Sequence, residues 1–219
     1  MNTKSFSCHF YPTASTTLAR LVARPAPFHA IDDCEEPIAG ALIFDPNAPA
    51  RFGSFKKALL GHTSSLVLGS RKNICIKQCW YRGQTTGSRL IYDSATQVMK
   101  LSQELNCIRW ASGLMHLVYD FIDKHIQSEP APFKIPKMRF VFTALVVIDN
   151  ETHDTYMIEE MIDDASEGDF VKYIGNNSAK PVCFLDQGMV TRAEFLAFCQ
   201  HVQYVKTKQL AFIGDFQGK

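Results

Sequence analysis

Residues 73–81 have the sequence Asn-Ile-Cys-Ile-Lys-Gln-Cys-Trp-Tyr. This apolar run with β-branched and aromatic residues predicts a strand. Because side chains alternate between the two faces of a strand, Cys75, Lys77 and Cys79 are expected on one face. A lysine among apolar neighbours is costly to bury unless it meets an anion. The run therefore predicts a sheet that carries a charged group in need of a partner.

Further strands are expected on both sides of this run. Phe52–Leu60 predicts a strand entered through Gly53, and Ser65–Leu68 is a short apolar run. Met138–Ile148 and Thr155–Ile162 flank a polar turn and predict a hairpin. Leu210-Ala211-Phe212-Ile213 predicts a last strand.

The segment after residue 92 predicts one long helix. Asp93 or Ser94 can cap its start, and it is expected to end before Pro130. Apolar residues recur at spacings of three and four, as on one helical face: Val98, Leu101, Leu105, Ile108, Met115 and Ile122. A second helix is expected from the capping box that begins at Thr191. The order of elements predicts an α+β fold, with one antiparallel sheet covered by a helix.

Composition excludes several classes of protein. The chain has 219 residues, 46 % of them hydrophobic, and a net charge of +1, so it is expected to fold and to lack the basic excess of a general nucleic-acid or membrane-surface binder. No apolar run reaches the roughly 20 residues of a membrane-spanning helix. Seven cysteines, an odd number, favour a reducing compartment. We therefore expect a cytoplasmic protein, although Arg20 and Arg24, with no acid before Asp32, weakly resemble a mitochondrial presequence.

Most of the ten prolines lie in the first 50 residues, so residues 1–50 are expected to form an irregular leader, with some helix around Thr16–Val22. Residues 51–219 are expected to form the folded domain.

The common catalytic fingerprints are absent. The sequence contains no P-loop motif, no Gly-x-Gly-x-x-Gly, no His-Arg-Asp, no Gly-x-Ser-x-Gly and no His-Glu-x-x-His. What remains is Lys77, which either binds nucleotide phosphates with a helix carboxylate such as Glu104 as its partner, or extends from an edge strand to water. Glu159 and Glu160 are adjacent on a strand and are expected to face opposite ways.

Five short motifs in order resemble those of the alpha-type protein kinases, the atypical serine/threonine kinases that include myosin heavy-chain kinase and elongation factor 2 kinase. They are Gly53-Ser54-Phe55-Lys56, Ile74-Cys75-Ile76-Lys77, Glu159-Glu160-Met161-Ile162, Phe170-Val171-Lys172-Tyr173 and Gly214-Asp215-Phe216-Gln217-Gly218. The resemblance covers roughly residues 52–219. It implies a kinase-like fold with an antiparallel-sheet N-lobe and one long helix, and a Mg-ATP-dependent transfer of phosphate to a protein hydroxyl. The partners it implies are ATP and a protein substrate, with neither nucleic acid nor membrane.

The resemblance also assigns roles to residues. Lys77 would bind the ATP phosphates, and Gly53 and Lys56 would line the phosphate side of the first strand turn. The hinge against adenine would be formed by Glu159, Glu160 and Met161. Asp215 would be the catalytic aspartate, Lys172 and Asn176 would lie near the nucleotide and metal, and Gln217 would help to hold Mg²⁺. His201 matches the first ligand of the family's structural zinc.

The family continues beyond Gly218 with a second metal-binding aspartate, a glycine-rich substrate loop and the remaining zinc ligands. The resemblance therefore implies a C-terminally truncated domain with an incomplete C-lobe. Zinc is not expected, because a structural site needs four ligands. Loss of packing partners predicts an exposed apolar patch near the C-terminus and self-association. The alternative to an active kinase is a nucleotide-binding or interaction module without catalysis.

Overall fold

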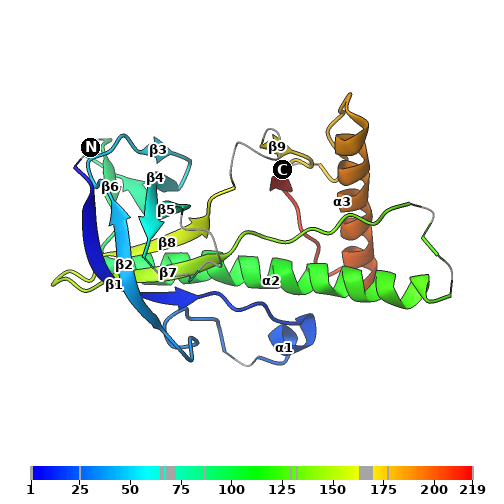
Figure 1. Ribbon diagram of the computed structural model, residues 1–219, viewed down its shortest axis with the longest axis horizontal. Helices are drawn as coiled ribbons and strands as arrows, with labels where there is room; N and C mark the ends of the chain where they lie inside the picture. Colours follow the sequence, from blue (N-terminus) through cyan, green and yellow to red (C-terminus); the bar gives the residue numbers. More distant parts are fainter. Residues whose placement is uncertain are drawn as a thin grey trace. The chain divides into compact units, whose positions relative to one another are not determined.

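The computed structural model describes residues 2–24, 26–64, 67, 73–85, 87–128, 130, 131, 133–162, 170–176 and 178–218. The chain forms two compact units. The first contains Met1–Ala14, Pro25–Ile108 and Val141–Met161, and the second contains Ser15–Arg24, Arg109–Phe140 and Ile162–Lys219. The long helix α2 (Ser94–Ile126) contributes residues to both units (Figure 1). None of the helices in the described ranges has the length and apolar character needed to cross a bilayer.

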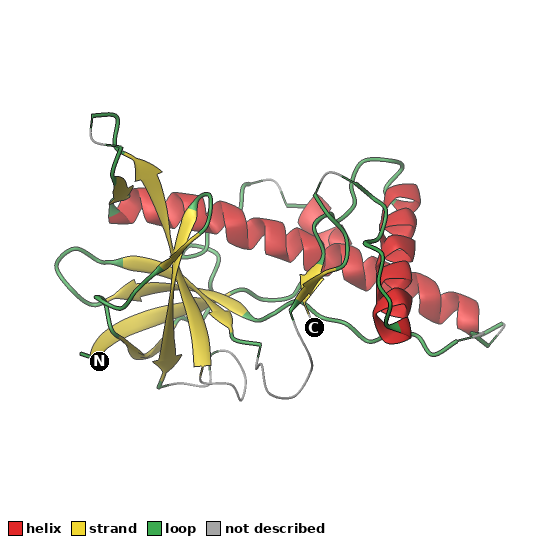
Figure 2. Ribbon diagram, turned by 90° about the horizontal axis from the view of Figure 1, so that it is seen from above, coloured by secondary structure: helices red, strands yellow, loops and turns green. Residues whose placement is uncertain are grey.

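The first unit is built on an antiparallel, barrel-like sheet. Its main strands are β1 (Lys4–Pro12), β2 (Ile38–Phe44), β4 (Lys56–Thr63), β5 (Asn73–Arg82), β7 (Thr143–Ile148) and β8 (Thr155–Glu160). They pair in the order β4-β2-β1-β7-β8-β5, and β5 pairs back to β4, which closes the circle (Figure 2). The short strands β3 (Arg51–Phe52) and β6 (Arg89–Ile91) extend the sheet at β4 and β5. The expected mixed fold with an antiparallel sheet is confirmed, and its closure was not foreseen.

Alternation along the strands fills the interior of this sheet. In β5, Ile74 and Ile76 are buried inside, whereas Cys75 and Lys77 are only half-buried on the outer face. The inner cluster also takes buried side chains from the other strands: Cys8, Phe10, Leu42, Phe44, Leu59, Ala144, Val146, Ile148, Tyr156 and Ile158.

The first part of α2 covers one outer face of the sheet. Leu101 and Leu105 are buried against Cys79, Leu145 and Met157. Asp93 caps the helix, since its carboxylate accepts a hydrogen bond from the main-chain N–H of Thr96 at 2.8 Å. The predicted long helix and its cap are therefore confirmed.

The second unit is helical with one small strand pair. Its elements are α1 (Leu18–Val22), β9 (Val171–Lys172), α3 (Gln187–Lys206), β10 (Gln217–Gly218) and the second part of α2. Buried side chains of α2, α3 and the two strand segments form its core, among them Met115, Val118, Ile122, Tyr173, Ile174, Phe195, Cys199, Val202 and Phe216. Several apolar side chains near the C-terminus are exposed: Phe198, Tyr204, Val205, Leu210 and Phe212.

The expectation that residues 1–50 form an irregular leader is wrong. Strands β1 and β2 lie in the middle of the sheet, where β1 pairs with both β2 and β7. Pro12 ends β1 and Pro37 precedes β2, so these prolines mark strand boundaries, where a missing N–H is tolerated. The short predicted helix is present as α1.

Three other element boundaries also differ from the sequence analysis. Residues 53–55 form a turn that separates β3 from β4 instead of continuing one strand. Helix α3 begins at Gln187 rather than near Thr191, because the Asp186 carboxylate accepts a hydrogen bond from the N–H of Met189 at 2.8 Å. Met138–Phe142 is irregular, so the hairpin strand begins only at Thr143.

The last predicted strand, residues 210–213, is absent. Its backbone bonds instead to side chains of α3: Ile213 N–H donates to Gln203 and the Gln200 amide donates to Ile213 O at 2.6 Å. The prediction for residues 65–68 falls outside the described residues except for Val67, which lies in a turn.

We expect Gly61→Ala to destabilise the first unit. A Cβ at Gly61 would lie 2.6 Å from Ile76 Cδ1 and 2.8 Å from the carbonyl oxygen of Ile43. Such overpacking in a closed sheet costs about 1–3 kcal/mol. Chemical unfolding monitored by circular dichroism measures the loss. Gly53→Ala is the matched control, because its Cβ would meet its nearest atom, Lys56 O, at 3.6 Å. Equal midpoints for both variants would contradict the packing argument.

Candidate functional site

Lys77 lies in the middle of β5, between β4 and β8, so it is not on an edge strand. Its Nζ forms an ion pair with Glu159 Oε2 at 2.5 Å, and the two side chains are 23 % and 19 % exposed. Glu159 lies on β8 directly opposite Cys75, one diagonal step from Lys77. The anion that a half-buried lysine requires is therefore supplied by the neighbouring strand.

Glu104, expected as the partner of Lys77, instead binds Lys56. The Lys56 Nζ lies 2.6 Å from Glu104 Oε1. Lys56 pairs with Cys79 across the sheet, and Cys79 is covered by α2, the helix that carries Glu104. Lys77 lies two residues from Cys79 along β5, and its ammonium group contacts Glu159 of β8 instead of Glu104. The geometry thus replaces the expected helix-to-strand pair with two separate ion pairs.

Cys75 lies among these charges. Burial raises the pKa of the Cys75 thiol, while the nearby positive charge of Lys77 acts in the opposite direction. Glu159, Arg51 and Lys56 also act on this thiol electrostatically. The outer face of β5 therefore presents a half-buried thiol beside a charged cluster, and alternation from Lys77 accounts for its position.

The predicted hinge residues have different surroundings. Glu160 is only 5 % exposed, and its carboxylate accepts a hydrogen bond from the N–H of Phe142 at 3.1 Å. Glu159 and Glu160 thus have separate partners, as expected for neighbours on a strand. The main-chain N–H of Met161 donates to Asn73 O at 3.1 Å. Gly53 lies in the β3–β4 turn, where its N–H donates to Lys56 O at 2.8 Å.

The second unit brings two of the predicted motifs together. Strands β9 and β10 are antiparallel, with Gln217 opposite Lys172. The Lys172 Nζ lies 2.6 Å from Asp215 Oδ1, and both side chains are almost half exposed. Asp215 has a φ of 56°, in the left-handed region that is unusual for a residue other than glycine. Such backbone geometry is common where a side chain is held in a functional orientation.

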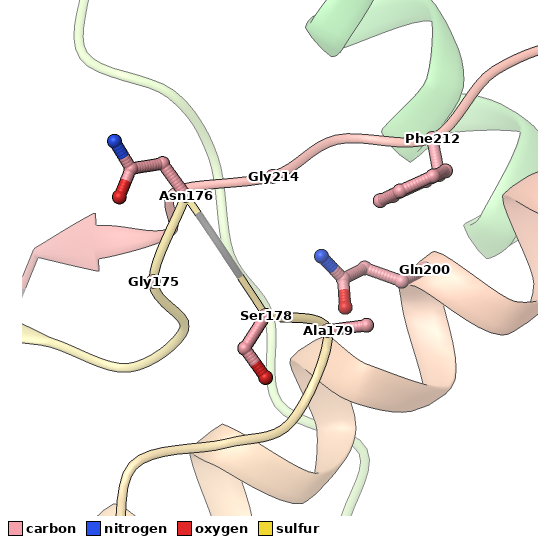
Figure 3. A pocket seen from close by; sticks show the side chains of 7 residues that line it. All are labelled: Gly175, Asn176, Ser178, Ala179, Gln200, Phe212 and Gly214. Atoms are coloured by element: carbon pink, nitrogen blue, oxygen red, sulfur yellow. The ribbon is translucent and has the colours of Figure 1, made fainter.

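A pocket of about 220 Å³ lies beside this strand pair (Figure 3). Gly175, Asn176, Ser178, Ala179, Gln200, Phe212 and Gly214 line it. In Figure 3 the Asn176 side chain points away from Gln200, so Asn176 lines the pocket mainly through its backbone. Gln200 was missed by the sequence analysis. Its place next to Cys199, on the buried side of α3, could have identified it, because Gln200 is a polar residue that is only 5 % exposed.

The predicted metal ligands divide by their surroundings. Gln217 and Asn176, the residues expected near Mg²⁺, both belong to the second unit and carry side-chain oxygen atoms, which Mg²⁺ prefers. His201 is exposed on α3. The described ranges contain no group of three or more His, Cys, Asp or Glu side chains placed to hold a metal ion.

The predicted residues therefore form two sets. Lys56, Lys77 and Glu159 act on Cys75 in the first unit, and Glu104 acts on the neighbouring Cys79. Gly53, Glu160 and Met161 belong to the same unit. In the second unit Lys172, Asp215 and Gln217 lie on one strand pair, with Asn176 close by in sequence and at the pocket.

Comparisons with known proteins do not place the chain in a family. No protein-family model matches it, and no curated protein matches it. Its function must therefore be argued from its own residues and from the motifs that they form.

Lys77 and Glu159 should be energetically coupled. Because both side chains are mostly buried, removing either charge leaves the other without its partner. We expect Lys77→Met and Glu159→Gln each to destabilise the unit, and the double variant to lose less than their sum, with a coupling of about 1–2 kcal/mol. A double-mutant cycle in urea measures it. Strict additivity would show that the two side chains do not interact in solution.

Proposed function

We propose that this chain is a Mg-ATP-dependent serine/threonine protein kinase domain of the alpha type. One observation carries the proposal. Charged residues from different motifs pair with one another: Lys77 with Glu159, and Lys172 with Asp215. Each short motif match is weak evidence by itself. Chance matches, however, would not be expected to bring their charged residues into contact. The mixed fold, with an antiparallel sheet under a long helix, is compatible with the kinase-like fold that the resemblance implies.

Phosphoryl transfer needs positioned positive charge more than covalent chemistry from the protein. Lys77 and Lys56 supply it on the outer face of the sheet, and their carboxylate partners hold both ammonium groups in place before nucleotide binds. Bound Mg²⁺ would neutralise further phosphate charge. In the reaction the substrate hydroxyl oxygen bonds to the γ-phosphorus, and the bond from that phosphorus to the β–γ bridging oxygen breaks. ADP leaves, and the hydroxyl proton is released to solvent.

Asp215 is proposed to orient the substrate hydroxyl. Its left-handed backbone fixes the direction of the side chain, and Lys172 holds its carboxylate. Asparagine tolerates the left-handed region better than alanine does. Asp215→Asn is therefore the variant that removes the charge with least disturbance of the backbone.

Transfer of radiolabelled phosphate from ATP to the chain itself and to dephosphorylated casein tests the proposal. We expect Lys77→Met and Asp215→Asn to reduce transfer by about a hundredfold or more, because each removes a charge from the reacting groups. Lys180→Met, at an exposed lysine outside the motifs, is the matched control. Equal transfer by the wild type and both site variants would refute the assigned roles.

Cys75 provides a separate test of nucleotide binding. Because it lies beside Lys77, a bound triphosphate should shield its thiol from iodoacetamide. Burial raises the thiol pKa, so labelling should increase as the pH rises above the ordinary thiol range. Mass spectrometry should show Mg-ATP slowing the modification of Cys75 and leaving the exposed Cys107 and Cys183 unchanged. Unchanged labelling of Cys75 at saturating ATP would count against a nucleotide at Lys77.

The two experiments also separate the active kinase from the alternative. Protection of Cys75 without phosphate transfer would identify a nucleotide-binding module that lacks catalysis.

A further inference from the structure

Positive charge is unevenly distributed along this nearly neutral chain. Between Asp45 and Asp93 there is no acidic residue, yet residues 51–92 contain eight of the 23 Lys and Arg residues. This segment forms strands β3 to β6. A local excess of one charge in a chain of net charge +1 indicates a surface that attracts anions.

Most described cations of this segment form ion pairs, are half-buried or lie near Cys75. Lys56 and Lys77 have carboxylate partners from α2 and β8. Lys57 is half-buried, and burial lowers its pKa while Asp154 acts in the opposite direction. Arg51 lies near Cys75, on the face of the predicted nucleotide residues. Among the described cations of this segment, Arg82 and Arg89 are the two left.

Arg82 and Arg89 lie directly opposite each other on β5 and β6. Side chains in such a pair share one face of the sheet, with Cβ atoms about 5 Å apart, and like charges there destabilise the pairing. Both residues are exposed, and neither forms an ion pair with any residue in the described part of the chain. An anion that bridges the two guanidinium groups would remove this repulsion.

Aromatic side chains hold one of these arginines in place. The Arg89 guanidinium carbon lies 4.3 Å from the ring centroid of Phe52 and 5.2 Å from that of Trp80. The two rings meet edge to face at 6.0 Å, and the Trp80 indole N–H donates to Gly53 O. Stacking fixes the plane of the guanidinium, and its N–H groups make no hydrogen bond to any residue that the structure describes. Phe55 in the adjoining turn is 76 % exposed, so an apolar contact surface adjoins the cations.

We propose that this surface, formed by Arg82, Arg89, Phe52, Phe55 and Trp80, binds a phosphorylated serine or threonine of a peptide segment that carries an apolar residue next to the phosphate. A phosphomonoester offers nearly two negative charges and three acceptor oxygens at one point, which matches two facing arginines. A nucleic acid would need cations spread along a track of phosphates. Here the other described cations of the segment are paired, half-buried or near Cys75. This inference is independent of the proposed kinase activity.

Thermal unfolding tests the bridging anion with inorganic phosphate as the probe. At constant ionic strength, phosphate should raise the melting temperature of the wild-type chain more than chloride does, and should raise it less in Arg82→Gln. In chloride alone Arg82→Gln should melt at the same temperature or higher, because it removes a like-charge pair. Arg20→Gln, at an exposed arginine of α1, controls for net charge. A phosphate shift that is equal in Arg82→Gln and Arg20→Gln would overturn the proposal.

Fluorescence anisotropy with labelled nine-residue peptides tests the ligand class. The probes carry one phosphoserine followed by phenylalanine, and their unphosphorylated counterparts and a ten-nucleotide oligo(dT) serve as comparisons. We expect binding of the phosphopeptide alone, weakened about tenfold by Arg82→Gln or Arg89→Gln, as for loss of a charge-assisted hydrogen bond. Lys180→Met, at an exposed lysine outside this surface, should bind the phosphopeptide like the wild type. Tighter binding of oligo(dT), or equal binding by the arginine variants, would refute it.

Discussion

Strand β5 pairs with β4 on one side and β8 on the other, and this double pairing both closes the barrel and determines which way each of its residues faces. Ile74 and Ile76 must then fill the interior, so Cys75 and Lys77 must lie outside. A shift of one residue in register would bury Lys77 among apolar side chains and expose both isoleucines. The position of the charged face follows directly from the demand for an apolar interior.

Placing Lys77 and Lys56 on a face partly covered by α2 creates a second demand, because half-buried ammonium groups need anions. The chain meets it with acids from distant segments: Glu159 is 82 residues from Lys77, and Glu104 is 48 residues from Lys56. These pairs connect β8 to β5 and α2 to β4, so the same contacts that neutralise the lysines also connect the layers of the first unit. In the proposed nucleotide site, a phosphate would compete with those carboxylates for the same ammonium groups. Before a nucleotide binds, the carboxylates would hold the ammonium groups in position.

Patterns that repeat within a short window could be predicted from the sequence. The alternation in 73–81 and the spacing of apolar residues after Asp93 both specify their elements, and both appear where expected. Partner choice was harder to predict, because it depends on register and on contacts between distant segments. Glu104 is an acid on the helix that covers the sheet, as expected for a partner of Lys77. It binds Lys56 instead, because the strand register places Lys56 opposite Cys79, beneath that helix. The last predicted strand fails for a related reason: Gln200 and Gln203 of α3 satisfy the backbone of Ile213, so this segment does not need a neighbouring strand.

Net charge illustrates the same limit. A balance of +1 argues correctly against a chain that is basic overall, but it averages a segment without acids against a remainder that is acidic. Among the cations described in that segment, Lys56 and Lys77 form ion pairs with acids from other elements, so their charges help to hold the fold together. Arg82 and Arg89 differ because the β5–β6 pairing sets them face to face with no acid from elsewhere paired to either among the described residues. Like charges that oppose each other across a sheet weaken the strand pairing, and an anion bound between these two arginines would remove that cost.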